Sequence, residues 1–459
     1  MLPTAFIAEM ESILPHSHQQ FLAALQTPSP TSIRLNNNKL AKNPYLEYSP
    51  VAWAKTGFYL PQRPIFTLNP LFHGGGFYVQ EAASMFIEQF ITQYQREVGE
   101  INIALDLCAA PGGKTTHINS LLPANSLIIS NETVKNRAFI LVENTQKWGN
   151  LNQVVLNENV DKLSEKLANW ANLVLVDAPC SGEGMFRKDP ESVKEWSPQA
   201  VKNCALRQKN IIDAAAQILA PDGLLIYSTC TYNRAENEEI AAYLFENQDF
   251  EPFNLQQIEA TWGLEVREQA KAQIYKFFPH QTQSEGFSIF AAIKKGGEIA
   301  NNKKATARKL QLLNSKQYEP FSYLIRTKAI HWINHQNNLR IFPDFATEKI
   351  AYLYQNCNVL HAGATVGELA KNELRPAHNL ALCCDLDTNA FEKIALSLEN
   401  ALYFMRLDSF ELPQNAPKGW ILLTYENLPL GWIKNIGGRY NNYYPPHWKI
   451  RMEINKLNG

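Results

Sequence analysis

A repeated order of apolar strand and helix, from about residue 101 to residue 246, constrains the fold of this chain more than any other feature. Short, nearly continuous apolar segments predict buried strands at 101–107, 127–131, 153–156, 173–176 and 224–227. Longer amphipathic segments predict helices at 114–122, 198–219 and 235–246. Strands and helices that alternate in this way form a parallel, doubly wound sheet with helices on both faces. The ligand site of such a sheet lies at the carboxyl ends of its strands.

Regions outside this alternation predict an edge hairpin and a separate lobe. Strand-like segments at 274–278 and 287–293 are joined only by a polar loop, which predicts an antiparallel edge to the sheet. Before residue 40, two short helices precede a strand-like segment. We therefore expect a small N-terminal α/β lobe at residues 1–95 and the doubly wound domain at residues 96–295.

Residues beyond the predicted sheet divide into a linker and a further domain. Residues 296–315 are polar, basic and without an apolar period, which predicts a linker that is either solvated or faces nucleic acid. Residues 316–459 are rich in Trp, Tyr and Asn and predict a compact β-rich domain. We expect a monomer, because one chain already contains three parts: the N-terminal lobe, the doubly wound domain and the C-terminal domain.

Composition excludes several classes of protein. Hydrophobic residues make up 45% of the chain and charged residues 19%, which is typical of a globular protein and not of a disordered one. No uncharged apolar segment approaches the roughly 18 residues of a membrane span, so we expect a cytoplasmic protein without a membrane partner. Seven scattered cysteines without a CxxC pair predict reduced thiols, with neither a disulfide framework nor a metal site. The formal net charge of -1 means that a nucleic-acid surface needs local charge segregation.

The loop after the first predicted strand has the composition of a nucleotide-cofactor site. Its residues are Cys108, Ala109, Ala110, Pro111, Gly112, Gly113 and Lys114. Small residues let the backbone approach a ligand closely, and the amides that open the next helix favour a carboxylate or phosphate. The loop is neither a GxGxxG motif nor a Walker loop, which argues against a dinucleotide or an ATP phosphate site. Glu132, after the second strand, is placed to accept hydrogen bonds from ribose hydroxyls.

Two cysteines follow neighbouring strands of the predicted sheet. Asp177 and Cys180 come after the fourth strand, which Pro179 ends, and Cys230 comes after the next strand. A single cysteine at a strand end is usually a small buried hydrophobic residue. Two of them beside a carboxylate and a cofactor loop predict a site where thiols carry out the chemistry.

Three segments together resemble the signature blocks of the Nop/Sun family of S-adenosylmethionine-dependent RNA cytosine carbon-5 methyltransferases. They are residues 107–114, 177–182 and 228–232, the last with Glu236 and Asn237. Residues 57–61 and 78–85 extend the resemblance, which is closest to a bacterial branch that acts on small-subunit ribosomal RNA. The resemblance implies a Rossmann-like class I methyltransferase domain, S-adenosylmethionine as cofactor, and small-subunit (16S) ribosomal RNA or the 30S subunit as partner.

The resemblance also implies a role for each site residue. Cys230 would be the nucleophile that adds to carbon 6 of cytosine, because carbon 5 alone is too weak a nucleophile to take a methyl group. Cys180 would assist loss of the carbon-5 proton and release of the enzyme. Asp177, beside the cofactor, would stabilise charge at the ring nitrogen and exocyclic amine. Apart from the resemblance, a free thiol is mostly protonated at neutral pH, so a nearby cation is needed, and we expect Lys114 or Lys188 to favour the thiolate.

The cofactor assignments follow the same resemblance. Residues 108–114 would hold the methionine and ribose portions, and Glu132 the ribose hydroxyls. One position departs from the family pattern: where related enzymes have an aspartate for the adenine amino group, spacing points to Asn159. Because an Asn oxygen accepts this hydrogen bond without a charge, we expect retained but weaker cofactor binding.

The C-terminal domain resembles a PUA-like RNA-binding module over residues 363–370 and 374–376. Its exposed charge would come from Arg439, Lys449 and Arg451. The aromatic residues among them either stack on bases or form the core of the domain; they are Tyr440, Tyr443, Tyr444 and Trp448. The N-terminal lobe would likewise contact RNA.

Two alternatives remain open from the sequence. One is a transfer-RNA or DNA cytosine methyltransferase; the DNA enzymes use the thiol of the Pro-Cys segment as nucleophile. The other is a catalytically silent ribosome-assembly factor. The presence of Cys180, Cys230 and Asp177 argues against the second alternative.

Overall fold

The computed structural model describes residues 2–296, 310–335, 337–370 and 373–454. Within these residues, one ten-stranded sheet has the order β10-β11-β12-β8-β7-β4-β5-β6-β15, with β9 paired to β12. Its five parallel strands are β4 (Ile103–Asp106), β5 (Leu127–Asn131), β6 (Gln153–Leu156), β7 (Ala171–Asp177) and β8 (Leu219–Thr229). The predicted doubly wound sheet is confirmed. Its strand order changes direction between β4 and β7, which is where such sheets bind ligands.

Antiparallel strands extend this sheet at both edges. The predicted hairpin is confirmed as β11 (Ala272–Phe277) and β12 (Phe287–Lys294), with β12 antiparallel to β8. The strands β9 (Phe250–Pro252) and β10 (Glu265–Gln269) add to the same side. At the other edge, β15 (Val359–Ala362) pairs with β6, so a segment of the C-terminal region completes the central sheet. The sequence did not predict β15, because it is too short to show a period.

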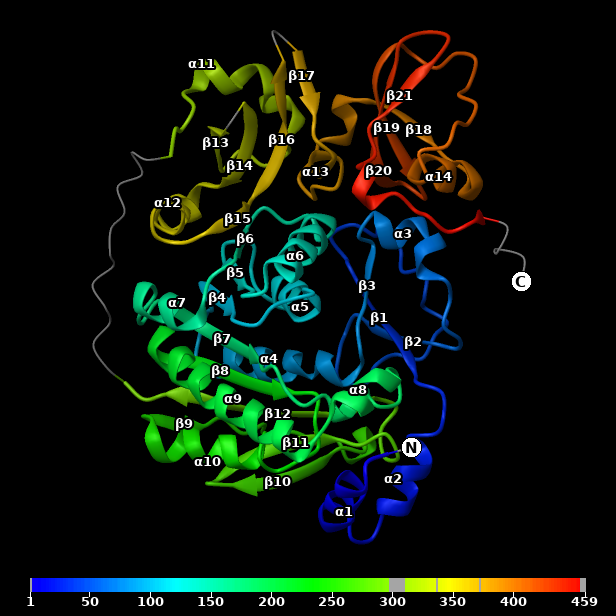
Figure 1. Cartoon of the computed structure of the whole chain (residues 1–459). Coiled ribbons are helices and arrows are strands. Elements are labelled where there is room, and N and C mark those ends of the chain that lie inside the picture. Colours follow the sequence, from blue (N-terminus) through cyan, green and yellow to red (C-terminus); the bar gives the residue numbers. More distant parts are fainter. Residues whose placement is uncertain (1, 297–309, 336, 371–372, 455–459) are drawn as a thin grey trace.

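Helices cover both faces of the sheet, as Figure 1 shows. One face packs against α4 (Ile87–Glu97), α5 (Gly113–Leu121) and α6 (Lys135–Trp148). The other packs against α7 (Val160–Lys166), α9 (Pro198–Ile218) and α10 (Glu238–Asn247). Alternate residues of β4 lie in opposite cores, Leu105 in one and Ala104 in the other, as the pleat of a strand requires.

The start of α10 differs from the prediction by three residues, since the helix begins at Glu238 and not at residue 235. The Asn233 side chain accepts a hydrogen bond from the Glu236 backbone N–H at 2.9 Å. Local bonds of this kind compete with helix formation. They leave the segment after Cys230 as an ordered loop beside the site.

The predicted N-terminal α/β lobe is confirmed. Helices α1 (Thr4–Ile13) and α2 (His18–Ala24) precede an antiparallel sheet in which β1 (Thr31–Leu35) lies between β2 (Gly57–Leu60) and β3 (Phe77–Val79). Arg34 of β1 is fully buried and donates to Thr116 Oγ1 of α5 at 2.6 Å. The lobe is therefore joined to the helix that follows the cofactor loop.

The C-terminal region is β-rich, as predicted. One four-stranded sheet contains β13 (Ile330–His335), β14 (Asn338–Pro343), β16 (Ala364–Ala370) and β17 (Glu373–Pro376). Another contains β18 (Glu392–Ala395), β19 (Gly419–Tyr425), β20 (Leu428–Asn435) and β21 (Tyr440–Asn442). The short helices here are α11 (Ser315–Tyr318), α12 (Thr347–Asn356), α13 (His378–Ala381) and α14 (Leu398–Met405). Most of the predicted basic linker, residues 297–309, lies outside the described residues.

The aromatic residues of the C-terminal tail serve mainly as core. Tyr444 is 2% exposed and Trp448 9% exposed, and both pack in the core around β19 and β20. Arg439, Lys449 and Arg451 are exposed, so the charge lies outside this core. Of the helices in the described ranges, none has the length and apolar character needed to span a membrane.

Candidate active site

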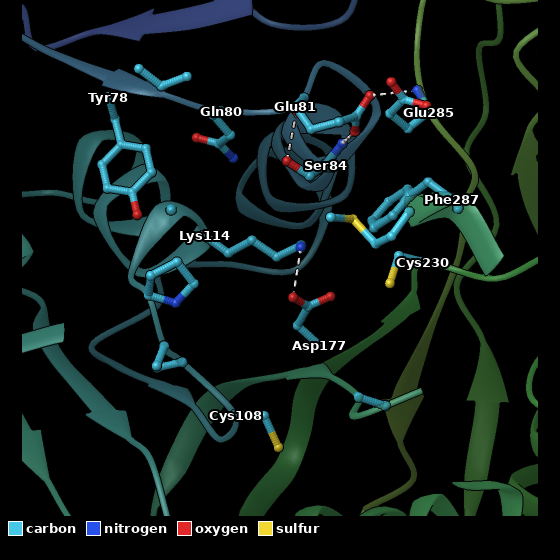
Figure 2. Close-up of a pocket in the computed structure, with 18 of the residues that line it drawn as sticks. Tyr78, Gln80, Glu81, Ser84, Cys108, Lys114, Asp177, Cys230, Glu285 and Phe287 are labelled. Atoms are coloured by element: carbon cyan, nitrogen blue, oxygen red, sulfur yellow. Dashed lines mark hydrogen bonds and ion pairs between the residues drawn. The ribbon is translucent and has the colours of Figure 1, made fainter. Parts of the chain in front are cut away.

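A cavity of about 420 Å³ lies at the carboxyl ends of β4, β7 and β8, where the fold places a ligand. Its floor includes Cys108, Lys114, Asp177 and Cys230. The N-terminal lobe forms part of its wall with β3 and the residues just after it, and Phe287 of β12 forms another part. Figure 2 shows these side chains around the open space. The predicted cofactor loop and one predicted cysteine therefore share one cavity.

The loop between β4 and α5 has the backbone that its glycines allow. Gly112 has φ +111°, a left-handed conformation that favours glycine, and it immediately precedes α5. A Cβ on Gly113 would lie 3.2 Å from Tyr78 Cε1, so a side chain at this position would require the Tyr78 ring to shift slightly. Arg137 donates to the Ala110 carbonyl at 2.8 Å and holds the loop from α6.

Asp106, at the end of β4, has a carboxylate oxygen that fits a cationic ligand group. Thr115 Oγ1 donates to Asp106 Oδ2 at 2.6 Å. Asp106 Oδ1 is buried and has no hydrogen-bond partner among the described residues, although Asp106 lines the cavity. Burial raises the pKa of Asp106 to about 7. Such an unsatisfied acceptor needs an explanation, and an amino group of a ligand would satisfy it.

Asn159, the residue expected to contact adenine, caps a helix in this structure. It is exposed at the start of α7, where its side-chain oxygen accepts the backbone N–H groups of Asp161 and Lys162 at 2.9 and 3.3 Å. Asn159 does not line the cavity. Because this oxygen caps the helix, its acceptance of a hydrogen bond from an adenine amino group remains a prediction.

Glu132 is buried directly after β5 and lies outside the cavity lining. Its Oε1 accepts the Val134 backbone N–H at 2.9 Å, and its Oε2 lies 3.4 Å from Arg137. Both oxygens therefore have partners within the protein. Its contact with ribose remains a prediction.

The two predicted cysteines lie side by side on neighbouring loops. Cys180 Sγ is 3.1 Å from Cys230 Sγ, because β7 and β8 are paired in parallel with Asp177 opposite Ser228. The hydrogen bond with Cys230, together with burial, raises the pKa of Cys180 well above its usual range. Either sulfur can donate this hydrogen bond, and of the two only Cys230 lines the cavity. This arrangement favours Cys230 as the reactive thiol.

Asp177 is paired with a buried lysine. Lys114 Nζ lies 2.8 Å from Asp177 Oδ2, and Ser228 Oγ donates to Asp177 Oδ1 at 2.8 Å. Burial alone would lower the pKa of Lys114, but the charge of Asp177 outweighs it and the pKa is raised. Lys114 therefore stays cationic near Cys230. The other predicted cation, Lys188, forms an ion pair with Glu285, in which Lys188 Nζ lies 3.9 Å from Glu285 Oε1.

Two buried glutamates, whose roles the sequence did not reveal, hold the cysteine loops together. Glu183, three residues after Cys180, accepts the backbone N–H groups of Tyr232 and Asn233 from the Cys230 loop at 2.8 and 3.1 Å. Glu236, from the Cys230 loop, accepts the Ser181 backbone N–H at 3.0 Å. We call this pair the glutamate clasp. The sequence feature that could have indicated these roles is an acidic residue in the polar loop after each of the two cysteines.

Because Glu183 accepts several buried hydrogen bonds in the glutamate clasp, we expect Glu183→Gln to lower the stability of the protein strongly. Glu183 also accepts from Trp196 Nε1 and Asn233 Nδ2, both at 3.0 Å, so its two oxygens receive four donors. A glutamine NH2 would face two of these donors. We expect a loss of about 3 kcal/mol of unfolding free energy and a fall in Tm of several degrees.

Thermal unfolding would measure this change. Glu191→Gln is the matched control, because Glu191 forms an exposed pair with Lys194 and should cost less than about 1 kcal/mol. Equal Tm values for the two variants would contradict a structural role for the clasp.

Three family models match the chain. Residues 95–293 match "16S rRNA methyltransferase RsmB/F", residues 2–82 match the N-terminal domain of 16S rRNA methyltransferase RsmF, and residues 391–450 match the methyltransferase RsmF PUA domain. The ribosomal RNA small subunit methyltransferase F of Pectobacterium atrosepticum is 29% identical over 97% of this chain and 95% of its own. That of Salmonella typhi is 29% identical over 96% and 95%.

Solved structures show the same fold. A methyltransferase homologue from Pyrococcus horikoshii is 26% identical, with a TM-score of 0.53 over 64% of this chain and 95% of its own. NSun6 from Pyrococcus horikoshii, at 19% identity, has a TM-score of 0.54 over 64% of this chain and 99% of its own. The three matched regions follow one another in the order that the fold shows, and the chain belongs to the RsmF family of methyltransferases.

Proposed function

We propose that this protein transfers a methyl group from S-adenosylmethionine to carbon 5 of cytosine in small-subunit ribosomal RNA. The observation that carries the proposal is the pair of thiols 3.1 Å apart, one of which opens into the cavity beside the Lys114–Asp177 pair. The relatives named as small-subunit ribosomal RNA methyltransferases support the choice of RNA. We expect a monomer that acts in the cytoplasm, where ribosomal subunits are assembled.

The first step uses Cys230. Its thiolate forms a bond to carbon 6 of cytosine, and the electron pair of the carbon 5–carbon 6 double bond moves toward carbon 5 and the adjoining ring atoms. Carbon 5 thereby becomes nucleophilic. S-adenosylmethionine, when bound, supplies an electrophilic methyl group for carbon 5. Residues 108–114 and the free oxygen of Asp106 are the groups that would hold it at the cavity.

The last step uses Cys180. Bonding of the Cys230 sulfur to carbon 6 removes one of the two main influences that raise the pKa of Cys180, the other being burial, and the proposed step requires the Cys180 proton to pass to solvent. The Cys180 thiolate then accepts the carbon-5 proton. The electron pair of that C–H bond forms the double bond again, and Cys230 leaves carbon 6 as a thiolate.

Asp177 is expected to stabilise the charge that develops on the ring, and Asp177→Asn tests this role. The substitution keeps the shape of the side chain but removes the charge that faces Lys114. We expect kcat to fall by about 10²- to 10³-fold with the fold unchanged. Single-turnover methyl transfer would measure it.

The matched control is Asp189→Asn. Asp189 caps α8 (Pro190–Glu195) outside the cavity, and asparagine caps a helix equally well. Its kcat should stay unchanged. A fall of less than about tenfold for Asp177→Asn would count against an electrostatic role in the transition state.

The proposed substrate is tested by transferring labelled methyl groups to small subunits, naked 16S RNA and transfer RNA from cells that lack this gene, followed by bisulfite sequencing. We expect new 5-methylcytosine in the small-subunit RNA. The target base must leave its stack to reach Cys230, so a loop or locally melted segment is the expected site. Methylation of transfer RNA alone would overturn the choice of RNA, and no transfer to any RNA would favour an assembly factor.

A further inference from the structure

Gln80, which follows β3 in the N-terminal lobe, has an unsatisfied polar group at the cavity. The side chain is only 5% exposed and lines the same cavity as Lys114 and Asp177. Its oxygen accepts a hydrogen bond from Arg34 Nε at 2.8 Å. Its nitrogen Nε2 is buried and has no partner in the part of the chain that the structure describes. A buried NH2 group of this kind indicates a missing acceptor.

The orientation of this amide is set by Arg34. An arginine can only donate hydrogen bonds, so the Gln80 oxygen must face Arg34 and the NH2 group must face the other way. Arg34 itself cannot turn easily, because it is fully buried, bonded to Thr116 Oγ1, and packed 4.4 Å over the Trp148 ring. The N-terminal lobe thus holds this donor in a fixed orientation within the wall of the cavity.

The surroundings of Gln80 favour an anion. A Cβ on Gly113 would lie 3.8 Å from Gln80 Cδ, so the amide lies against the start of α5. The first N–H groups of a helix lack partners within it, and Gly112 has no side chain with which to cap them. Figure 2 shows Gln80 between Tyr78 and Glu81, near Lys114.

The nearby acid, Glu81, is hydrogen-bonded within the protein. Both oxygens of Glu81 already accept backbone N–H groups, one from Ser84 and one from Glu285, at 2.9 Å each. On the same cavity, Asp106 Oδ1 is an unsatisfied acceptor. The cavity therefore offers free donors and a free acceptor to one ligand, as an amino-acid zwitterion requires.

We infer that Gln80 binds the carboxylate of the methionine portion of the cofactor through its side-chain NH2 group, together with the free amides at the start of α5. This inference rests on the proposed function, because it assumes S-adenosylmethionine. It makes the N-terminal lobe part of the cofactor site. Arg34 is then a positioning residue that orients Gln80.

A comparison of two ligands distinguishes carboxylate binding by Gln80 from a general effect of the substitution on the cavity. S-adenosylhomocysteine contains the amino-acid portion, whereas 5′-methylthioadenosine lacks it. Gln80→Glu keeps an oxygen for Arg34 but replaces the NH2 group with a charged oxygen that repels a carboxylate. Calorimetry on the full chain without RNA should show S-adenosylhomocysteine binding weakened about 10- to 100-fold. The Kd of 5′-methylthioadenosine should change less than about twofold.

Gln62→Glu is the matched control, since it adds the same charge to the same lobe at an exposed position outside the cavity. It should leave both Kd values unchanged. Equal weakening of both ligands by Gln80→Glu would overturn the inference, because the effect would then be structural. No weakening of either ligand would also overturn it. If the wild-type protein binds neither ligand, the cofactor assignment fails and the inference fails with it.

Discussion

Cys230→Ala is expected to reduce methyl transfer by about 10⁴-fold or more, because no other sulfur at the cavity can add to carbon 6. Among the described cysteines, Cys108 also lines the cavity, but burial raises its pKa well above its usual range, so it stays protonated. Cys230 opens into the cavity and lies close to the buried cation of Lys114. Single-turnover transfer of labelled methyl groups to unmodified RNA would measure the loss.

The fold should survive this substitution, so binding of S-adenosylhomocysteine is expected to stay within about threefold of the wild type. Cys204→Ala is the matched control, because Cys204 is a half-buried thiol of α9 outside the cavity. It should retain full activity. Substantial methyl transfer by Cys230→Ala would show that another group is the nucleophile.

Cys180→Ala is expected to trap a covalent complex between protein and RNA. Cys230 would still bond to carbon 6 and the methyl group would still reach carbon 5, but the group that accepts the carbon-5 proton would be absent. Turnover should fall by about 10²- to 10⁴-fold. The trapped complex should migrate slowly on a denaturing gel and disappear after treatment with ribonuclease.

A double variant, Cys180→Ala with Cys230→Ala, should form no adduct, because the bond requires the Cys230 sulfur. Mass spectrometry of the trapped complex should place the nucleotide on Cys230. The opposite pattern, with an adduct on Cys180 when Cys230 is replaced, would assign the nucleophile to Cys180. That outcome is typical of DNA cytosine enzymes and would overturn the proposed roles.

The local elements of the catalytic domain could be predicted because their signals are local. The segments at 127–131 and 153–156 match β5 and β6 in both bounds. The predicted helix at 198–219 matches α9 closely, since Ser197 caps it and Pro198 occupies its first turn. The shared cavity at the ends of β4, β7 and β8 followed from the alternation of strands and helices.

Features that depend on distant segments could not be predicted in this way. Asn159 matched the family position by spacing, yet its oxygen caps α7, which depends on where that helix begins. The strand β15 joins β6 across about 200 residues, and a four-residue segment has no period to indicate its partner. Whether the tail aromatics Tyr444 and Trp448 stack on bases or form the core depends on their burial, which the fold determines.

The order of amino acids specifies which chemical groups this protein has: two cysteines and an aspartate at the ends of neighbouring strands, and a small-residue loop before a helix. The parallel arrangement of the strands then places all of these groups together, because the carboxyl ends of parallel strands lie on the same side of the sheet. Three features follow from the packing of the folded chain: which sulfur lines the cavity, how Glu183 and Glu236 join the two cysteine loops, and which way the Gln80 amide faces. These depend on hydrogen bonds between segments far apart in the chain, and a buried donor or acceptor takes its partner from whatever packing brings near it.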